Sequence, residues 1–455
     1  MAKKPSISYI CSECGYKSAT KYGKCPNCKS FGTMEEEIQE TIKSINRMTS
    51  SNSNAKKLST VIASNTSNLL KTNIGEFDRV VGGGLVADSV NVISAPPGTG
   101  KSTLLLSVAQ ALAEQGNNVL YIAGEESESQ IKLRAERVLT NISDNIYIKS
   151  ETNLETILST IDAISPQLLI IDSIQMLFSS ESDGTLGGEK QLLHCSSAIL
   201  NKAKNSANSM CVFFVGQVTK DDELRGSREF EHMVDAVFTL SLGDESGVLR
   251  MFRATKNRFG DTSEVGLFEM REEGMVELAN PNKYFITERT TPVSGSAISA
   301  IKEGSRTIAI EINALAETNN FTYPSRISQG IGKDFLQIVL AIIGNKLSSN
   351  VKKKDIYIQT SNGIKIKDTY VGLGIVAAVD SAINQIPIPS DIAFVGEVSL
   401  TGEIKKVPNV DRIISDFERM GFKEIVVPKN NAQKKFSKIK VIEIGNIKEI
   451  SSIIK

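Results

Sequence analysis

The sequence predicts an α/β protein with more than one domain. From residue 69 to residue 280, short apolar runs alternate with helical patterns, which favours a largely parallel sheet covered by helices. A second region of mixed strand and helix patterns runs from 285 to 455, and a small cysteine-rich head occupies residues 1–33. A chain of 455 residues is also longer than one hydrophobic core normally fills.

The expected elements follow from these patterns. Between the head and the first α/β region, residues 34–68 are rich in Ser, Asn, Lys and Glu, and we expect a flexible linker in which 35–45 are briefly helical. The first region then has expected strands at 90–95, 118–124, 168–173 and 211–216, and extended segments at 236–242, 249–255 and 265–270. The second has expected helices at 334–347, 372–383 and 412–422, and strands at 355–361, 393–400 and 424–428.

Composition is that of an ordinary globular protein, with 40% apolar and 23% charged residues. We expect no membrane span, because no apolar run reaches about 18 residues, and the N-terminus has no apolar signal segment, so a cytoplasmic protein is expected. Lys and Arg total 52 and so do Asp and Glu, so net charge neither predicts nor excludes a nucleic-acid partner. Residues 1–33 and 401–455 carry an excess of cations, which indicates either solvated surface or a patch for a polyanion.

Four cysteines in the head form two Cys-x-x-Cys pairs, Cys11 with Cys14 and Cys25 with Cys28. Such pairs bring four thiolates to the corners of a tetrahedron around Zn²⁺, and two disulfides are the alternative. Because four cysteines leave no open position, the zinc is expected to be structural and to supply the folding energy of a head with almost no core. Cys195 and Cys211 lie in apolar surroundings and are expected in the core.

Residues 95–103, "APPGTGKST", lie between an expected strand and an expected helix. Glycines in such a loop let backbone N–H groups turn toward phosphate oxygens, and the helix N-terminus adds its positive dipole. Lys101 is expected to bridge the outer phosphates and Ser102 to ligate Mg²⁺. The predicted binding residues for ATP and Mg²⁺ are Ala95, Pro96, Pro97, Gly98, Thr99, Gly100, Lys101, Ser102, Thr103 and Asp172.

Three further strand ends supply the expected catalytic groups. Asp172 ends an apolar strand and fits the carboxylate that holds Mg²⁺ through water. Glu125, supported by Glu126, is expected to polarise the attacking water, although an acidic turn that caps the next helix is the alternative. Gln217 is expected to sense the γ-phosphate. The alternative is an ordinary surface glutamine without a specific role.

The ordered motifs "APPGTGKST", "GEES", "LLIIDSIQ", "GQVTK", "EHMVD" and "KNRFG", behind a four-cysteine head, closely resemble the bacterial RadA (Sms) family of DNA repair proteins over nearly the whole chain. The resemblance implies a RecA-like ATPase that assembles as a hexameric ring on single-stranded and branched DNA. It also implies branch migration during recombination together with the RecA recombinase. Gln217 replaces the histidine expected in "GHVTK", and Tyr22 stands where the family usually has Trp.

Lys256 and Arg258 of "KNRFG" follow a strand near the rim of the expected ATPase domain. In a ring they could reach the γ-phosphate of a neighbouring subunit as cationic fingers. Contact with DNA phosphates and a solvated basic turn are the alternatives. The loops after the strands of Asp172 and Gln217 are polar and contain glycine, so we expect them to be mobile, and in a RecA-like ring a single strand of DNA would pass them in the pore. Their cations are Lys190, Lys220, Arg225 and Arg228.

The C-terminal region resembles the proteolytic domain of Lon proteases in the segments "IKIKDTYVGLGIVAAVDSAI" and "FVGEVSLTGEIKKVPNVDRI". That family uses a Ser nucleophile and a Lys base, whose positions fall on Tyr370 and Asp411 here. Neither side chain can perform that chemistry, and Ser361, Ser381 and Ser399 have no base at a suggestive spacing. We therefore expect an architectural, inactive domain.

Two other functions are alternatives for the whole protein: a RecA-like signalling ATPase that acts on proteins, and an ATP-dependent protease.

Overall fold

The computed structural model describes residues 7–11, 17–18, 20, 22–31, 34–38, 69–205, 209–217, 228–244, 246–278, 281–319, 323–347 and 349–454. The chain divides into two compact units, residues 1–64 and residues 65–455, and each is described by itself. Within the described part of the chain, no helix has both the length and the apolar character that crossing a bilayer requires.

The head is a small antiparallel sheet. Its strands are β1 (Ile7–Cys11), β2 (Lys17–Ser18) and β3 (Met34–Ile38), in the order β2-β1-β3. Strand β3 begins inside the expected linker, where we predicted loop or helix, and it pairs with β1 from Ile7 opposite Ile38 to Cys11 opposite Met34. Pairing with a distant strand therefore decides the conformation of residues 34–38, which local composition alone misassigned. The rest of the predicted linker, 39–68, lies outside the described residues.

The first α/β domain contains a nine-stranded sheet with the order β12-β11-β10-β9-β4-β8-β7-β5-β6. Every pair from β9 to β6 is parallel, whereas β9 to β12 pair antiparallel, so the expected largely parallel sheet is confirmed. The strands are β4 (Val90–Ala95), β5 (Val119–Ala123), β6 (Ile146–Ser150), β7 (Leu168–Asp172), β8 (Cys211–Gln217), β9 (Ala236–Leu242), β10 (Leu249–Asn257), β11 (Val265–Arg271) and β12 (Gly274–Glu277).

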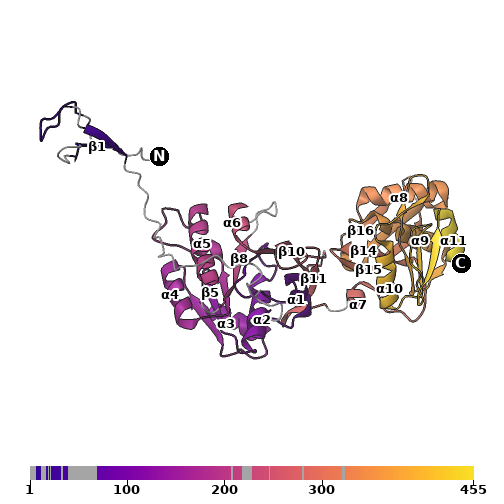
Figure 1. The fold of residues 1–455 in the computed structure, drawn as a ribbon. Helices are drawn as coiled ribbons and strands as arrows, with labels where there is room; N and C mark the ends of the chain where they lie inside the picture. The colour runs from indigo at the N-terminus through magenta and orange to yellow at the C-terminus, as the bar shows by residue number, and fades with distance from the viewer. Residues whose placement is uncertain are drawn as a thin grey trace. The chain divides into compact units, whose positions relative to one another are not determined.

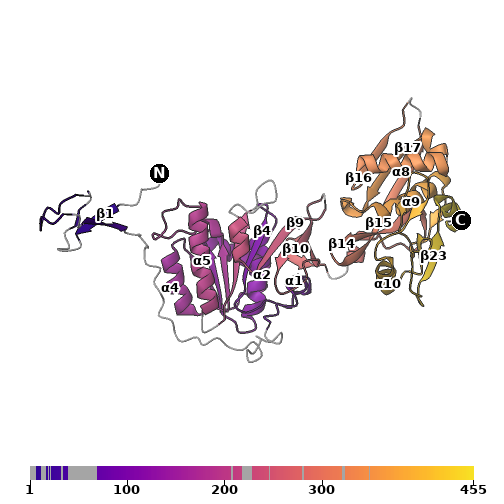
Figure 2. The same cartoon turned by 45° about the horizontal axis from the view of Figure 1, so that its top comes forward.

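Helices cover both faces of this sheet, as Figures 1 and 2 show. On one face, alternate residues of β5 pack with the leucines of α2 in one core; on the other, the intervening residues pack with α4 and α5. This two-sided burial explains why the central strands read as continuous apolar runs. The helices are α1 (Gly75–Val81), α2 (Lys101–Ala113), α3 (Glu128–Val138), α4 (Leu154–Ile164), α5 (Glu189–Asn205) and α6 (Arg228–Met233), with a 3-10 turn η3 (Ile174–Met176).

The second α/β domain begins with α7 (Pro281–Phe285) and is built on a seven-stranded mixed sheet, β16-β17-β15-β14-β19-β22-β23. The strands of the domain are β13 (Val293–Ser294), β14 (Ser296–Glu303), β15 (Arg306–Thr318), β16 (Arg326–Gln329), β17 (Lys354–Thr360), β18 (Pro387–Ile388), β19 (Ile392–Phe394), β20 (Glu397–Val398), β21 (Ile404–Lys405), β22 (Glu424–Pro428) and β23 (Lys440–Ile444).

Helices α8 and α9 pack in one core of this domain and α10 in another, so β14 has apolar residues on both sides. The helices are α8 (Lys333–Lys346), α9 (Gly372–Asn384), α10 (Val410–Met420) and α11 (Ile450–Ile453), with 3-10 turns η4 (Ser349–Lys353), η5 (Ser361–Gly363), η6 (Thr369–Val371) and η7 (Ile447–Glu449).

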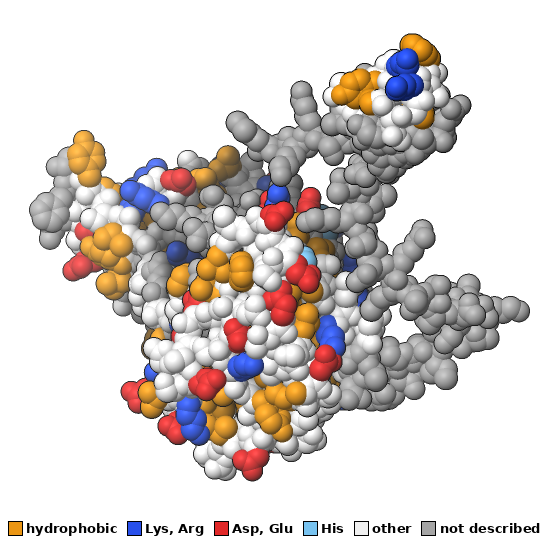
Figure 3. All heavy atoms as spheres, turned by 90° about the vertical axis from the view of Figure 1, so that its left-hand side faces the viewer, with side chains coloured by type: hydrophobic (Ala, Val, Ile, Leu, Met, Phe, Trp, Pro, Cys, Tyr) orange, Lys and Arg blue, Asp and Glu red, His pale blue; other side chains and the backbone are white. Residues whose placement is uncertain are grey.

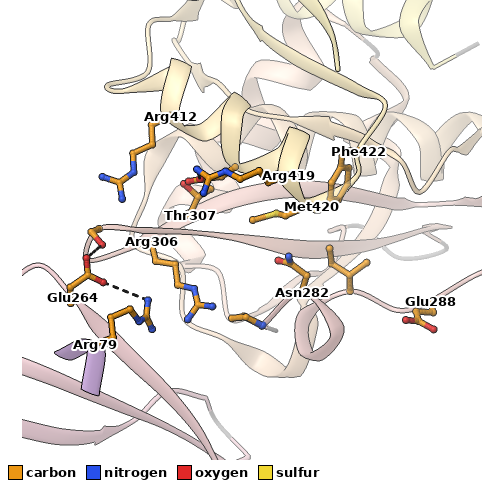
Figure 4. Close-up of a pocket in the computed structure, with 14 residues that line it drawn as sticks. Arg79, Glu264, Asn282, Glu288, Arg306, Thr307, Arg412, Arg419, Met420 and Phe422 are labelled. Atoms are coloured by element: carbon orange, nitrogen blue, oxygen red, sulfur yellow. Dashed lines mark hydrogen bonds and ion pairs between the residues drawn. The ribbon is translucent and has the colours of Figure 1, made fainter. Parts of the chain in front are cut away.

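Arginines line a hollow of about 720 Å³ in unit 65–455. Figure 4 shows Arg79 and Arg306 below the helix that carries Arg412 and Arg419. Arg79 and Arg306 both bond the buried carboxylate of Glu76, at 2.5 and 3.0 Å. Arg79 also pairs with Glu264 at 3.5 Å, so these ion pairs act as structural ties between α1 and the β14–β15 hairpin.

Candidate functional site: a nucleotide cavity at the carboxyl ends of the parallel strands

The expected phosphate loop joins β4 to α2 at the edge of the sheet where the parallel strands end. Gly98 and Gly100 have φ values of +77° and +104°, in the left-handed region that favours glycine. A Cβ on Gly100 would lie 2.5 Å from Cε of Met270 and 2.7 Å from Cε of Met275. Gly100 is therefore required both by its backbone and by the space around it.

Lys101, the first residue of α2, bends back over this loop. Its Nζ donates to the carbonyl oxygens of Ala95 at 2.9 Å and of Pro96 at 3.3 Å. Burial lowers the pKa of Lys101, and the nearby carboxylates of Asp172 and Glu125 oppose that shift. A cation held among carbonyl oxygens in this way is placed to exchange them for phosphate oxygens.

Arg250 supports the loop from β10, a contribution that sequence reasoning missed. The side chain is only 6% exposed, and its Nε donates to the carbonyl oxygen of Thr99 at 2.8 Å while Nη1 donates to that of Gly247 at 2.5 Å. Burial lowers the pKa of Arg250, and Asp244 opposes that shift. An arginine between the apolar residues Leu249 and Met251 was the available signal, because a buried charge needs partners.

Asp172 ends β7 beside the phosphate loop, as predicted. Its Oδ2 accepts hydrogen bonds from Ser102 Oγ at 2.5 Å and from the hydroxyl of Tyr121 at 2.6 Å. A carboxylate and a hydroxyl at this separation are the hard oxygen donors that Mg²⁺ prefers, so the donor set fits the ion. Tyr121 did not figure in the sequence analysis, although a lone tyrosine in an aliphatic strand was a visible signal.

Glu125 and Glu126 follow β5 and are oriented by two different partners. Glu125 Oε1 accepts a hydrogen bond from Ser173 Oγ at 2.6 Å, and Glu126 pairs with Arg134 at 2.7 Å. The cap of α3 is neither glutamate but Ser127, which forms a capping box with Gln130. The expected capping turn is therefore present at Ser127, directly after the two glutamates, and the catalytic role of Glu125 stays a prediction.

These groups surround one cavity of about 470 Å³. Nine of its lining residues were predicted from sequence: Pro97, Gly98, Gly100, Lys101, Ser102, Thr103, Glu125, Glu126 and Asp172. Arg134 and Arg137, three residues apart on α3, also line the cavity and were missed, as was Ser173. The positive charge of these two arginines suits a polyanionic ligand such as a nucleoside triphosphate.

Gln217 ends β8, whose register places it opposite Ala95 of the phosphate loop. Its side chain lies outside the described residues, so its sensing role stays a prediction. Lys220 and Arg225 also lie outside the described residues, as does the side chain of Arg228 at the start of α6.

Lys256 and Arg258 do not line the cavity in the described part of the chain; Lys256 contacts the C-terminal end of α6, and Arg258 contacts the segment that follows it. Lys256 Nζ donates to the carbonyl oxygens of Glu231 at 2.7 Å and Val234 at 2.8 Å. Arg258 pairs with the buried carboxylate of Asp235 at 3.0 Å. The reading of a merely solvated turn is therefore wrong for Lys256, whose burial lowers its pKa.

The loop after β7 was expected to be mobile, but part of it is tied to α5. The fully buried side chain of Gln191 donates to the carbonyl oxygens of Ser179, Ser182 and Gly184, at 3.0 to 3.1 Å. Lys190, which was expected in the loop, lies in the first turn of α5 and is exposed.

In the head, the second Cys-x-x-Cys pair forms a tight turn. The backbone N–H of Lys29 donates to the carbonyl oxygen of Cys25 at 3.0 Å, and that of Cys25 to Ser30 at 2.9 Å. Cys25 is buried and Cys28 is exposed. Cys11 ends β1, but its side chain and all of Cys14 lie outside the described residues. In the first α/β domain, Cys195 and Cys211 are buried in the core as expected.

The two positions that correspond to the Lon catalytic pair have other contacts. Tyr370 packs against the core that contains α10, and burial raises its pKa well above the usual range. Asp411 Oδ1 accepts hydrogen bonds from the backbone N–H groups of Gln433 at 2.9 Å and Lys434 at 3.4 Å. Ser361 and Ser381 bond backbone groups, and Ser399 bonds Thr401.

Comparison with known proteins gives a full-length match. The chain is 39% identical to the DNA repair protein RadA of Listeria monocytogenes over 433 residues, which cover 95% of this chain and 94% of that protein. It is 37% identical to the DNA repair protein RadA of Bacillus subtilis over 455 residues, covering 99% and 98%. The chain belongs to the RadA family of DNA repair proteins.

Family models match each part of this RadA family member. An AAA domain matches residues 57–194, a rubredoxin metal binding domain 9–36, and a Lon protease (S16) C-terminal proteolytic domain 287–454. The expected fold class is confirmed: a RecA-like ATPase domain between an N-terminal zinc ribbon and a C-terminal Lon-like domain. Among solved structures, the ATPase domain of another protein matches with a TM-score of 0.39 and 17% identity, covering 46% of this chain and 91% of that chain.

Proposed function

We propose that this protein hydrolyses ATP as a hexameric ring on single-stranded and branched DNA, and promotes branch migration in the cytoplasm together with the RecA recombinase. One observation carries the dependence on a ring. The phosphate loop, Glu125 and Asp172 line the cavity, whereas Lys256 and Arg258 form their bonds outside it. A neighbouring subunit can supply these cations to the cavity, so that hydrolysis waits for assembly.

Within one subunit, each group at the cavity has a distinct task. The N–H groups of the loop and Lys101 bind the phosphates, and Glu125, held by Ser173, orients and deprotonates the attacking water. Ser102 and Asp172 would hold Mg²⁺, which shields the charge that accumulates on the phosphates during transfer.

The contacts of Lys256 connect this chemistry to the expected DNA site. Its ammonium group bonds carbonyl oxygens at the end of α6, and α6 follows residues 218–227 directly in the chain. In the proposal, DNA bound at those residues displaces α6 and frees Lys256 to reach the neighbouring subunit. Gln217 directly precedes residues 218–227, and in the proposal it senses whether the γ-phosphate is present and transmits that state to them.

On the face in Figure 3, the Lys and Arg side chains of the described residues are scattered among Asp and Glu. The proposed DNA contact lies in the pore of the ring, with Lys190, Lys220, Arg225 and Arg228 along the phosphate backbone. The lysine-rich C-terminal domain provides a second possible contact surface and the contacts that close the ring.

ATP turnover with and without single-stranded DNA tests the proposal directly. Wild-type protein should be stimulated by DNA, and Lys101→Ala should be inactive under both conditions. Lys256→Ala should keep its DNA affinity and lose DNA-stimulated hydrolysis. If Lys256→Ala instead loses DNA affinity with basal hydrolysis intact, Lys256 is a DNA contact and the finger is wrong.

ATP turnover that is unchanged by DNA would favour the alternative function, a signalling ATPase that acts on proteins.

For the C-terminal domain we propose no protease activity. Tyr370 is packed in a core and Asp411 bonds two backbone N–H groups, so neither is arranged as nucleophile and base. Digestion of casein in the presence of ATP would refute that proposal.

A further inference from the structure

Tyr121 lies in the middle of β5 and is completely buried. Its backbone is paired with Ile170 of β7 and Ile148 of β6. The side chain shares a core with Val119, Ala123 and the leucines of α2, so it points to the face of the sheet that α2 covers. Packing alone would be satisfied there by another apolar side chain, and the hydroxyl therefore needs a separate explanation.

The hydroxyl has one strong partner, the carboxylate at the cavity. It donates to Asp172 Oδ2 at 2.6 Å, the short distance typical of a hydrogen bond to an ionised acceptor. Burial, followed by the charge of Asp172, raises the pKa of Tyr121 well above its usual value. In this bond the tyrosine hydroxyl is the donor and the Asp172 oxygen is the acceptor.

Two donors meet at the same oxygen of Asp172. Ser102 Oγ lies 2.5 Å from Oδ2, and the hydroxyl of Tyr121 approaches the same atom. A carboxylate with one donor can rotate about its last bond, whereas two donors from different elements, α2 and β5, fix its plane. Oδ1 is then left to accept from other donors, such as a water bound to a metal ion.

We propose that Tyr121 is a positioning residue for ATP hydrolysis, which orients the Asp172 carboxylate for the magnesium–nucleotide complex. The inference rests on the proposed role of Asp172 and adds a residue that never touches the substrate. Ser102 can keep its bond to Asp172 while its oxygen ligates the ion, since the hydroxyl hydrogen and the lone pairs are separate. Tyr121 provides the second constraint whether or not the ion is bound.

The test is Tyr121→Phe, which removes one oxygen atom and keeps the ring. Binding of a fluorescent ATP analogue is measured with and without Mg²⁺, and hydrolysis is measured over a range of Mg²⁺ concentrations. We expect the Mg²⁺ concentration for half-maximal binding to rise about tenfold, in line with the loss of a hydrogen bond to a charged group. Binding without Mg²⁺ should match wild type, and thermal unfolding shows whether the domain stays folded, with some loss of stability expected from the lost hydrogen bond.

Tyr147→Phe is the matched control, because Tyr147 lies on edge strand β6 and is 40% exposed. An unchanged Mg²⁺ dependence in Tyr121→Phe would overturn the proposal. So would a loss of nucleotide binding that is equal with and without Mg²⁺, because that result describes packing alone.

Asp172→Asn separates this proposal from the one on which it rests. If Asp172→Asn leaves the Mg²⁺ dependence of binding unchanged, the proposed role of Asp172 itself is wrong. If Asp172→Asn abolishes that dependence while Tyr121→Phe has no effect, only the role of Tyr121 is wrong. In the Asp172→Asn background, adding Tyr121→Phe should have little further effect on Mg²⁺ dependence, since the two groups act as one unit.

Discussion

Replacing Arg250 with methionine should loosen the phosphate loop, although it changes none of the residues predicted to bind nucleotide. The guanidinium joins Thr99 in the loop to Gly247 in the turn before β10, with donor–acceptor distances of 2.8 and 2.5 Å. Methionine is of similar length and apolar, so it keeps the packing of the buried stem but loses both donors.

The expected size of the effect follows from the burial of these bonds. A hydrogen bond from a charged donor contributes roughly 1.5–3 kcal/mol, and here the carbonyl oxygen of Thr99 would lose its partner. Removing a buried charge recovers part of that loss, as the lowered pKa of Arg250 indicates. A net cost of about 1.4 kcal/mol on the ordered loop corresponds to about tenfold weaker nucleotide binding.

Titration with a fluorescent ATP analogue measures that change, and thermal unfolding without nucleotide shows whether the domain stays folded. Arg250→Lys should lie between wild type and Arg250→Met, because lysine keeps the charge but cannot reach two carbonyl oxygens in one plane. Arg271→Met is the surface control, since Arg271 is half exposed and pairs with Glu269 on its own strand. Nucleotide affinity within about twofold of wild type in Arg250→Met would refute the reasoning, because that difference is below the contribution of one such bond.

Three other predictions concern Ser173, Glu311 and Cys28. Ser173→Ala should lower kcat about tenfold with little change in KM, because Glu125 loses the donor that orients it at 2.6 Å; an unchanged kcat contradicts that role, and Ser129→Ala on the exposed side of α3 is the control. Burial pushes the pKa of Glu311 up, but bonds from Ser296, Thr287 and Arg289 outweigh it and hold the pKa below its ordinary value of 4.5. Glu311 thus stabilises the folded state above that value and stops doing so as the pH falls through its lowered pKa. Denaturant unfolding at a series of pH values should show Glu311→Gln about 2 kcal/mol less stable than wild type near neutral pH, with the difference shrinking in acid; a difference independent of pH contradicts the assignment. Cys28→Ser should remove the zinc, about one ion per chain by metal analysis, while basal ATP hydrolysis stays close to wild type, since head and core are separate compact units; zinc retained in full would exclude Cys28 as a ligand.

Local sequence patterns determined most of the elements that carry the site. Strand β4 has the bounds 90–95 that its apolar run predicted, and α8 differs from its expected range by one residue at each end. One exception is β3, since "MEEEI" is polar and becomes a strand only through its pairing with β1. Another is the expected strand 393–400, which is divided into β19 (Ile392–Phe394) and β20 (Glu397–Val398) in two different sheets. Long apolar runs specify their state because both faces are buried, whereas a short polar strand depends on its partner.

The sequence by itself determined which strand ends are candidates for the chemistry: the glycine loop, Glu125, Asp172 and Gln217 all lie at the carboxyl ends of parallel strands, and those ends meet at one edge of the sheet whatever the details of packing. Only the tertiary structure identified the groups that hold these residues in place. Tyr121, Ser173 and Arg250 come from a strand interior, a turn and a distant strand, and each acts through hydrogen bonds of specific geometry. Hydrogen bonds between residues 48 to 151 positions apart in the chain leave no periodic mark in the sequence, because the fold alone brings the two partners together.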